Sequence, residues 1–144
     1  MQATSRVKHF YSHAKYGDHN YDDRADCDWS IEAAPGKNVH LTFLTFEVED
    51  ETDCGYDFVE VFNGLDDSGA SYGKFCGSSV STEKFSNIFF FIIIASTFLF
   101  LFLQNPTDIF SVTEALVVRF RTDDTINFKG FSAAYVAVDP KESV

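Results

Sequence analysis

The sequence contains none of the short motifs that mark common catalytic sites. It has no HExxH pair of zinc-binding histidines, no GxSxG nucleophile turn and no glycine-rich phosphate loop. Its four histidines, His9, His13, His19 and His40, lack metal-binding spacing and are interpreted as surface residues. These absences argue against an enzyme, although carboxylates alone can support acid–base chemistry.

Positive charge is also scarce. Lys and Arg number 11 against 22 Asp and Glu, which gives a formal net charge of −11. Such a chain repels a phosphate backbone, so nucleic acid is excluded as a natural partner. Cations and basic protein surfaces suit it better.

A secretory signal is not visible. Residues Met1 to Lys15 lack an apolar core of the length that such a signal needs, and the chain contains no N-x-[ST] glycosylation acceptor. A chain of 144 residues is enough for one domain with a real core. If this domain belongs to a secreted protein, we expect the chain to be a fragment of a longer product or the product of an incompletely assembled gene.

Phenylalanine, in contrast, is abundant. Many of the 17 Phe residues lie in runs where apolar and polar residues alternate, which favours a β fold. The alternation predicts strands at residues 27–33, 39–48, 58–62, 72–76, 116–121 and 131–137.

The second of these strands changes phase. The apolar period of residues 39–43 continues at Phe46 on the opposite phase, which predicts a β-bulge at residues 44–45. We expect the shift to place Glu47 and Glu49 together on the polar side of the strand.

An acidic stretch between two strands carries the main functional signal. Glu49 and Asp57 lie eight residues apart across a turn that holds Cys54, so paired flanking strands would bring both carboxylates to one end of a sheet. A second acidic loop follows at residues 122–125. Calcium prefers oxygen ligands from such loops. A solvated acidic turn is the alternative that these residues alone leave open.

Several segments together resemble a CUB domain. Residues 20–80 and 114–138 contain DCDWSIEA, GKNVHLTF, FEVEDETDCGYDFVEVFNG, GKFCG and ALVVRFRTDDTINFKGFSAAY in the order and spacing of that family. The segments YSHAKYGDHNYDDRADCDW and FRTDDTINFKGF are most similar to the C-terminal CUB domain of tolloid-type astacin metalloproteases.

The resemblance implies a fold and a domain division. The expected fold is all-β, an antiparallel two-sheet β-sandwich of jelly-roll type. Residues 1–19 would form the N-terminal part of a domain truncated upstream, residues 20–138 the CUB domain itself, and residues 139–144 a tail.

The resemblance also implies a calcium site. Carried over by motif, its ligands are Glu49, Asp57 and Asp123, with Thr125 and Ile126 supplying further oxygens. In family members that bind ligands through this site, a lysine or arginine of the partner approaches the carboxylates and a neighbouring tyrosine. Tyr56 and Glu47 are the corresponding partner-binding candidates. A core or rim aromatic is the alternative role for Tyr56.

Disulfide pairing follows from the same family pattern. In a CUB domain the positions of Cys54 and Cys76 are paired, and a bridge closing that loop stabilises a fold by about 3 kcal/mol. Cys27 resembles the second cysteine of the first CUB pair, whose partner would lie upstream of this chain. We therefore expect Cys27 to be unpaired.

One hydrophobic segment has no counterpart in the family. Residues 88–103 are uncharged and shorter than the roughly 20 residues of a membrane-spanning helix. Val80-Ser81 can be encoded by the splice-donor sequence GTAAGT, and residues 98–104 by a pyrimidine-rich run ending in the acceptor CAG. Removing residues 80–104, which are 25 whole codons, keeps the reading frame and restores a CUB-length loop. We interpret residues 80–104 as a translated intron and expect them to protrude or to be poorly ordered.

Two functional hypotheses follow. The first is an extracellular, calcium-binding protein-interaction module, which contributes substrate or regulator binding to a tolloid-like metalloprotease. Proteolysis would then belong to a zinc metalloendopeptidase domain of the parent protein. The alternative is a membrane-anchored CUB protein that uses residues 88–103, although the flanking Asn87 and Gln104 are not the basic or Trp anchors expected at a bilayer edge.

Overall fold

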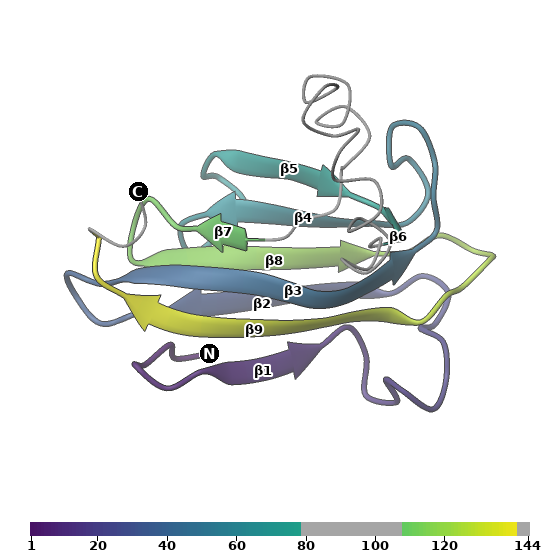
Figure 1. Cartoon of the computed structure of the whole chain (residues 1–144). Coiled ribbons are helices and arrows are strands. Elements are labelled where there is room, and N and C mark those ends of the chain that lie inside the picture. Colours follow the sequence, from purple (N-terminus) through teal and green to yellow (C-terminus); the bar gives the residue numbers. More distant parts are fainter. Residues whose placement is uncertain (79–107, 141–144) are drawn as a thin grey trace, which may run out of the picture.

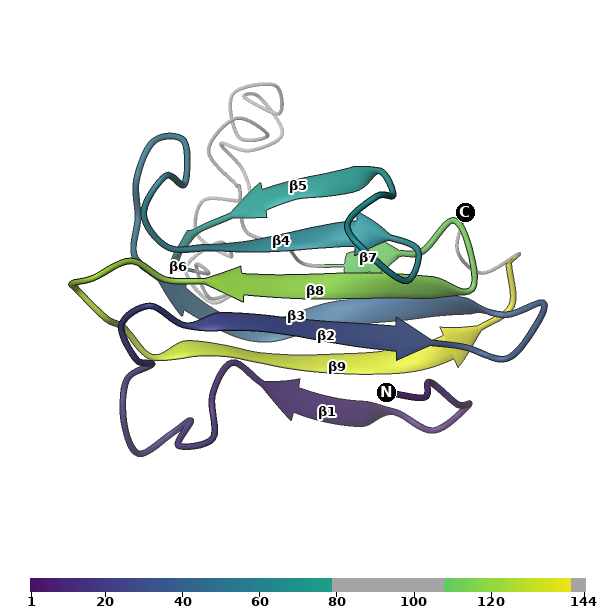
Figure 2. The same cartoon turned by 180° about the vertical axis from the view of Figure 1, so that it is seen from behind.

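The described part of the chain is a two-layer sandwich of β-strands. The computed structural model describes residues 1–78 and 108–140, and Figures 1 and 2 show its two sheets from opposite sides. The strands are β1 (Lys8–Tyr11), β2 (Asp26–Glu32), β3 (Asn38–Val48), β4 (Phe58–Asn63), β5 (Ser71–Phe75), β6 (Gly77–Ser78), β7 (Asp108–Phe110), β8 (Ala115–Arg121) and β9 (Gly130–Val138).

The strands form two antiparallel sheets. One sheet has the order β1-β9-β3-β6, with β7 also paired to β3, and the other has the order β2-β8-β4-β5. The fold predicted from the sequence, an all-β antiparallel sandwich, is therefore confirmed.

Aromatic rings fill the space between the sheets. Phe131 of β9 is fully buried and contacts Phe10 and Trp29 at centroid distances of 5.8 and 5.7 Å. Phe43 and Phe120 approach the same ring to 5.4 and 5.6 Å. These rings meet at steep angles, the arrangement that their quadrupoles favour. The alternating Phe residues of the sequence thus form one shared core.

The phase change within β3 is present. The pairing of β3 with β9 shifts between Phe43 and Thr45, which confirms the predicted bulge, and Leu44 is 52% exposed. Beyond the shift, Phe46 and Val48 return to the core.

The N-terminal segment contains a strand that the sequence pattern did not predict. β1 pairs with β9 along its whole length, from Lys8 opposite Tyr135 to Tyr11 opposite Ser132. Gly130 begins β9 at a φ of 86°, and a Cβ at this position would come within 2.0 Å of the Ser12 Oγ atom. Only glycine tolerates both conditions, which explains the glycine of the NFKG turn.

Two expectations fall on residues outside the described part. One is that residues 80–104 protrude or are poorly ordered, and the other is the alternative that residues 88–103 anchor the protein in a membrane. Both concern residues that the structure does not describe. Among residues 1–78 and 108–140, no helix is long and apolar enough to cross a bilayer.

Candidate metal centre

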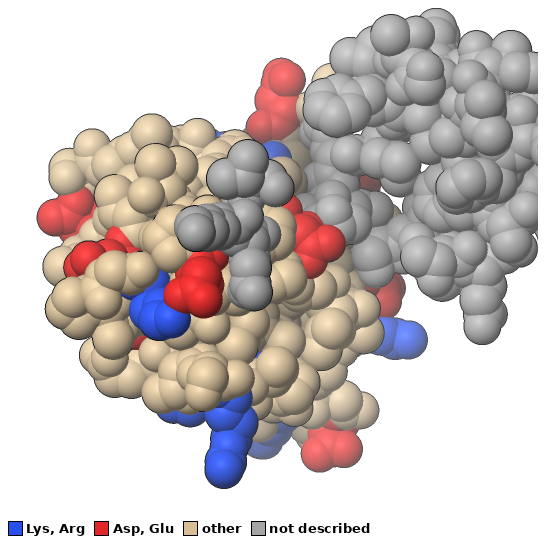
Figure 3. All heavy atoms as spheres, turned by 60° about the vertical axis from the view of Figure 1, so that its left-hand side comes forward, with Lys and Arg blue, Asp and Glu red and all other residues tan. Residues whose placement is uncertain are grey.

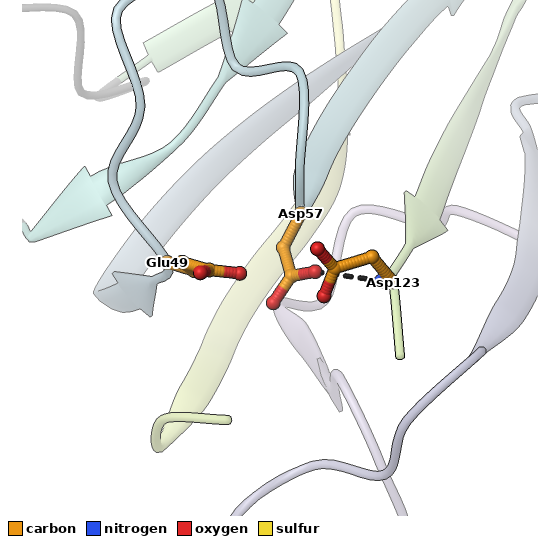
Figure 4. A group of neighbouring side chains, drawn as sticks. All are labelled: Glu49, Asp57 and Asp123. Carbon is orange, nitrogen blue, oxygen red and sulfur yellow. Dashed lines mark hydrogen bonds between the residues drawn. The ribbon is translucent and has the colours of Figure 1, made fainter. Parts of the chain in front are cut away.

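Three carboxylates meet at one end of the sandwich. Glu49 directly follows β3, Asp57 directly precedes β4, and Asp123 lies two residues after β8. One oxygen from each lies within 4.8 Å of the others, and Figure 4 shows Asp57 between its two neighbours. The predicted ligand carboxylates therefore converge, although the first and the last lie 74 positions apart in the sequence.

Asp57 is held from two sides. Its side chain is fully buried, and its Oδ1 atom accepts a hydrogen bond of 2.8 Å from the backbone N–H of Asp123. Its Oδ2 atom accepts one of 2.7 Å from the Tyr21 hydroxyl. The same hydroxyl accepts a bond of 3.1 Å from the backbone N–H of Glu49. Tyr21 thus links two of the three carboxylate-bearing loops.

Glu49 lacks such support. Its side chain is only 7% exposed, and its buried Oε2 atom has no hydrogen-bond partner in the described structure. Burial raises the pKa of Glu49, and the nearby Asp123 and Asp57 raise it further. A buried carboxylate without a partner is unfavourable unless a proton or a cation offsets its charge.

Asp57 experiences a similar conflict, but it has hydrogen-bond donors that Glu49 lacks. Burial is the largest effect on its pKa, which is raised, whereas the hydrogen bond from Tyr21 acts in the opposite direction. Asp123 adds a like charge close by. The site is therefore electrostatically unfavourable when all three carboxylates are ionised.

The donor set favours a hard cation. The group offers carboxylate oxygens without a cysteine or histidine, which suits calcium better than zinc. Thr125 and Ile126, the predicted sources of further oxygens, are exposed in the loop after Asp123, and the Thr125 N–H donates a 3.3 Å bond to Asp123.

The loops at this end are unusual in their backbone. Within the described residues, the non-glycine residues with positive φ are Arg24 at 52°, Cys54 at 51° and Ile126 at 63°. Cys54 lies in the loop that joins Glu49 to Asp57, and the Arg24 N–H donates a bond of 2.8 Å to the Asp123 carbonyl. Positive φ at a β-branched residue such as Ile126 is a genuine outlier, and such strain is common at functional sites.

The two partner-binding candidates differ in position. Tyr56 is 54% exposed beside Asp57, so it is a rim residue and not part of the core. Glu47 is half-buried within β3, opposite Ser78 and Gly130, and does not belong to the carboxylate group. The expectation that Glu47 and Glu49 share a polar face was wrong, because Glu49 lies beyond the end of β3 and turns into the buried group.

The covalent predictions are met. Cys54 and Cys76 form a disulfide, and Cys27 is a free, half-buried cysteine on β2. The bridge joins the loop between Glu49 and Asp57 to the short connection between β5 and β6. It therefore restrains one of the loops that carry the carboxylates.

Tyr21 is the site residue that the sequence analysis missed. It is 1% exposed, its ring packs edge-on against Phe120 at 5.1 Å, and its N–H donates to the Phe128 carbonyl. It lies in a loop without a period of two, so no strand pattern marked it. The NYDD segment that contains it was recognised only as part of the family resemblance.

The opposite end of the sandwich holds a groove instead of a group of buried carboxylates. This groove of about 680 Å³ opens between the turns that follow β2, β4 and β7. Its lining includes Glu32, Asn63 and Val112. Figure 3 views the molecule from that side, where basic and acidic side chains are interspersed.

Comparisons with known proteins agree with this architecture. The family model described as CUB domain matches residues 2–97. Human Tolloid-like protein 2 is 43% identical over 137 residues, which are 95% of this chain and 11% of that protein. A zinc metalloproteinase of Caenorhabditis elegans is 30% identical over 137 residues, 94% of this chain and 12% of that protein. The chain thus spans about a tenth of the length of these relatives.

A solved structure extends the agreement to three dimensions. The MASP-1 CUB2 domain bound to Ca²⁺ superposes with a TM-score of 0.62 at 21% identity. The match covers 94% of this chain and 96% of that one.

Proposed function

The chain belongs to the CUB domain family, and from this premise we propose that it is an extracellular protein-interaction module in which Glu49, Asp57 and Asp123 hold one calcium ion. The CUB domain is a non-catalytic type of module. The observation that carries the proposal is the buried, unpartnered Oε2 atom of Glu49 next to two further carboxylates.

Calcium resolves the electrostatic conflict of the site. A divalent cation between the carboxylates replaces their mutual repulsion with attraction and gives Glu49 a partner. Thr125 and Ile126 would add oxygens from the loop whose backbone is already in an unusual conformation. The MASP-1 CUB2 domain, which shares the fold, binds Ca²⁺, and this supports the choice of ion.

The ion would organise a contact surface. Tyr56 and Ile126 are both exposed, at 54% and 59%, and each adjoins a loop that carries a site carboxylate. A basic side chain of the partner would find an aromatic ring and acidic groups together there, with Glu47 at the periphery. Since the chain carries a net charge of −11, we expect affinity for such a partner to fall as salt rises.

Two observations support a proposal for the parent protein and its location. The disulfide between Cys54 and Cys76 favours an oxidising compartment, which supports an extracellular location. Relatives include Tolloid-like protein 2 and a zinc metalloproteinase. We propose that the module contributes substrate or regulator binding to a tolloid-like metalloprotease. A membrane-anchored protein remains the second candidate only if residues 88–103 are present in the mature chain.

Thermal melting with and without calcium tests the proposal. Ion binding to the native state alone stabilises it by about 2.7 kcal/mol when free calcium is a hundredfold above the dissociation constant. We expect a higher midpoint in calcium than in chelator, and no such difference for Asp123→Ala. Asp124→Ala is the matched control, because the side chain of Asp124 is 75% exposed and pairs with Arg24. Equal melting midpoints of the wild-type domain in calcium and in chelator would contradict the proposed calcium site.

A further inference from the structure

β6 and β7 lie on the same edge of β3 and run in the same direction. Ser78 of β6 is opposite Glu47, and Asp108 of β7 is opposite Thr42. Both short strands are antiparallel to β3, so the chain that leaves Ser78 points along β3 towards the position of Asp108. Figure 1 shows the two strands near opposite ends of β3.

The register leaves room for very few residues between them. On β3, the four residues 43–46 separate Thr42 from Glu47. In the sequence, 29 residues, 79–107, separate Ser78 from Asp108. A strand that follows β3 residue for residue therefore has a surplus of 25, the difference between 29 and 4. The surplus is 26 if the strand skips Leu44 as β9 does.

We propose that β6 and β7 are the two halves of one edge strand, and that the working form of the domain joins Ser79 directly to Asn105. Residues 80–104, whose ends can be encoded by splice-donor and splice-acceptor sequences, number 25 and so match the surplus of a strand that follows β3 residue for residue. The strand register thus gives, from backbone pairing, the same length that the family spacing of the sequence indicates. The proposal does not rest on calcium binding.

The burial of the two halves constrains how a single strand could join them. Gly77 and Ile109 are both buried, opposite the core residues Val48 and Leu41. Asp108 points outwards, where its carboxylate accepts bonds from His40 and Thr42. In the joined chain Gly77 and Ile109 lie seven positions apart, and strict alternation would put them on opposite faces. Both face the core only if the joined strand carries a bulge alongside the one in β3.

The joined chain would also supply edge pairing for residues 43–46 of β3. In the described structure, no strand pairs with residues 43–46 of β3 on the side of β6 and β7. An unpaired stretch of edge is a template for association with other chains, and proteins commonly cover it. In the joined chain, Ser79, Asn105, Pro106 and Thr107 would cover these four residues, and proline is tolerated on an edge strand.

Sequencing of the mature message is the first test. Reads across the codons of Ser79 and Asn105 are expected to lack the 75 nucleotides that encode residues 80–104 in most transcripts. A majority of mature transcripts that retain these nucleotides would contradict the proposal.

Hydrogen exchange on the protein is the second test. Three chains are compared: the full chain, a chain without residues 80–104, and a control without residues 80–99, which keeps five residues too many. In the chain without 80–104, the edge-facing amides of residues 43–46 should exchange at least about tenfold more slowly than in the other two. Equal exchange in all three, or failure of the shortest chain to fold, would overturn the proposal. Calcium titration of each chain separates this outcome from failure of the metal site.

Discussion

Two groups of acidic residues in this domain differ in how their charge is offset. Asp26 and Asp28 on β2 and Asp67 in the connection between β4 and β5 form ion pairs with Arg119 and Arg121 of β8. Arg119 contacts Asp28 through two nitrogens at 3.0 and 3.1 Å and Asp67 through one at 3.0 Å. We refer to these five residues as the arginine-paired group.

Among residues 1–78 and 108–140, no basic side chain forms an ion pair with the carboxylates of the metal centre. The pKa of Asp28 is lowered, chiefly by the hydrogen bond from Arg119, whereas the pKa values of Glu49 and Asp57 are raised by burial. The comparison teaches that a run of acidic residues does not by itself indicate a metal site. Burial without a basic partner is the stronger signal, because the fold then leaves a charge that a proton or an ion must offset.

Among the variants considered, Asp57→Ala should lower the stability of the domain most and should abolish calcium binding. The change leaves the Tyr21 hydroxyl and the Asp123 N–H without their acceptor, and each orphaned buried group destabilises by about 1–3 kcal/mol. We expect the free energy of unfolding to fall by about 2–5 kcal/mol in chelator, and the response to calcium to disappear. Urea denaturation with and without calcium measures both. A variant that still melts higher in calcium would contradict the role of Asp57.

Glu49→Gln removes the charge of this side chain while keeping its shape, so it tests what the charge does to stability. Because the metal-free fold holds an unpartnered carboxylate here, its removal should stabilise the domain in chelator at pH 7 by about 1 kcal/mol. The same change should abolish the gain from calcium. Loss of stability in chelator would show that Glu49 is favourable without an ion.

The difference in stability between the wild type and Glu49→Gln should depend on pH in a defined direction. A folded-state pKa above the unfolded value means that the fold binds the proton more tightly. The contribution of Glu49 to stability is therefore greatest at low pH and declines as pH rises from the unfolded value, about 4.3, through the raised pKa. The gap between Glu49→Gln and wild type in chelator should widen over that range and close below it.

Arg119→Ala should have a smaller effect and leave calcium binding intact. Its partners are partly exposed, and such pairs contribute at most about 1 kcal/mol. The lowered pKa of Asp28 provides stability above its unfolded value that is lost as pH falls, so the variant should lose less stability on acidification. Acid titration of both proteins, followed by circular dichroism, checks this. An altered calcium response would show that the two groups are coupled.

Asp67→Ala should have the smallest effect. Its carboxylate is 57% exposed, and Asp28 remains to pair with Arg119. We expect the free energy of unfolding to change by less than about 0.5 kcal/mol, and the calcium response to stay as in the wild type. Melting in calcium and chelator measures both, and a loss of more than 1 kcal/mol would mean that Asp67 is not interchangeable with Asp28.

The regular strands could be predicted because their core faces alternate. Residues 39–43 place Val39, Leu41 and Phe43 inwards at every second position, and even the bulge between Phe43 and Thr45 left a phase change in the sequence. β1 left no such record. It is four residues long, and only Phe10 is buried within it.

The site could be predicted only in part. The three carboxylates were identified through a family motif, but the sequence could not show that Glu49 is buried and Glu47 is not. That difference depends on where β3 ends, which is set by pairing with β6 and β9. Tyr21 could not be found from periodicity, since it is held by partners 28 and 36 residues away in the sequence.

The position of β9 has a consequence for synthesis. β9 is the last strand in the sequence, yet it lies between β1 and β3 in the five-stranded sheet. Lys8 cannot pair with Tyr135, nor Phe46 with Phe131, until almost the whole domain has left the ribosome. The early strands therefore spend the period of translation without their main partner, when exposed strand edges are most prone to mispairing. The five-stranded sheet can therefore form only late in synthesis, once β9 has been translated.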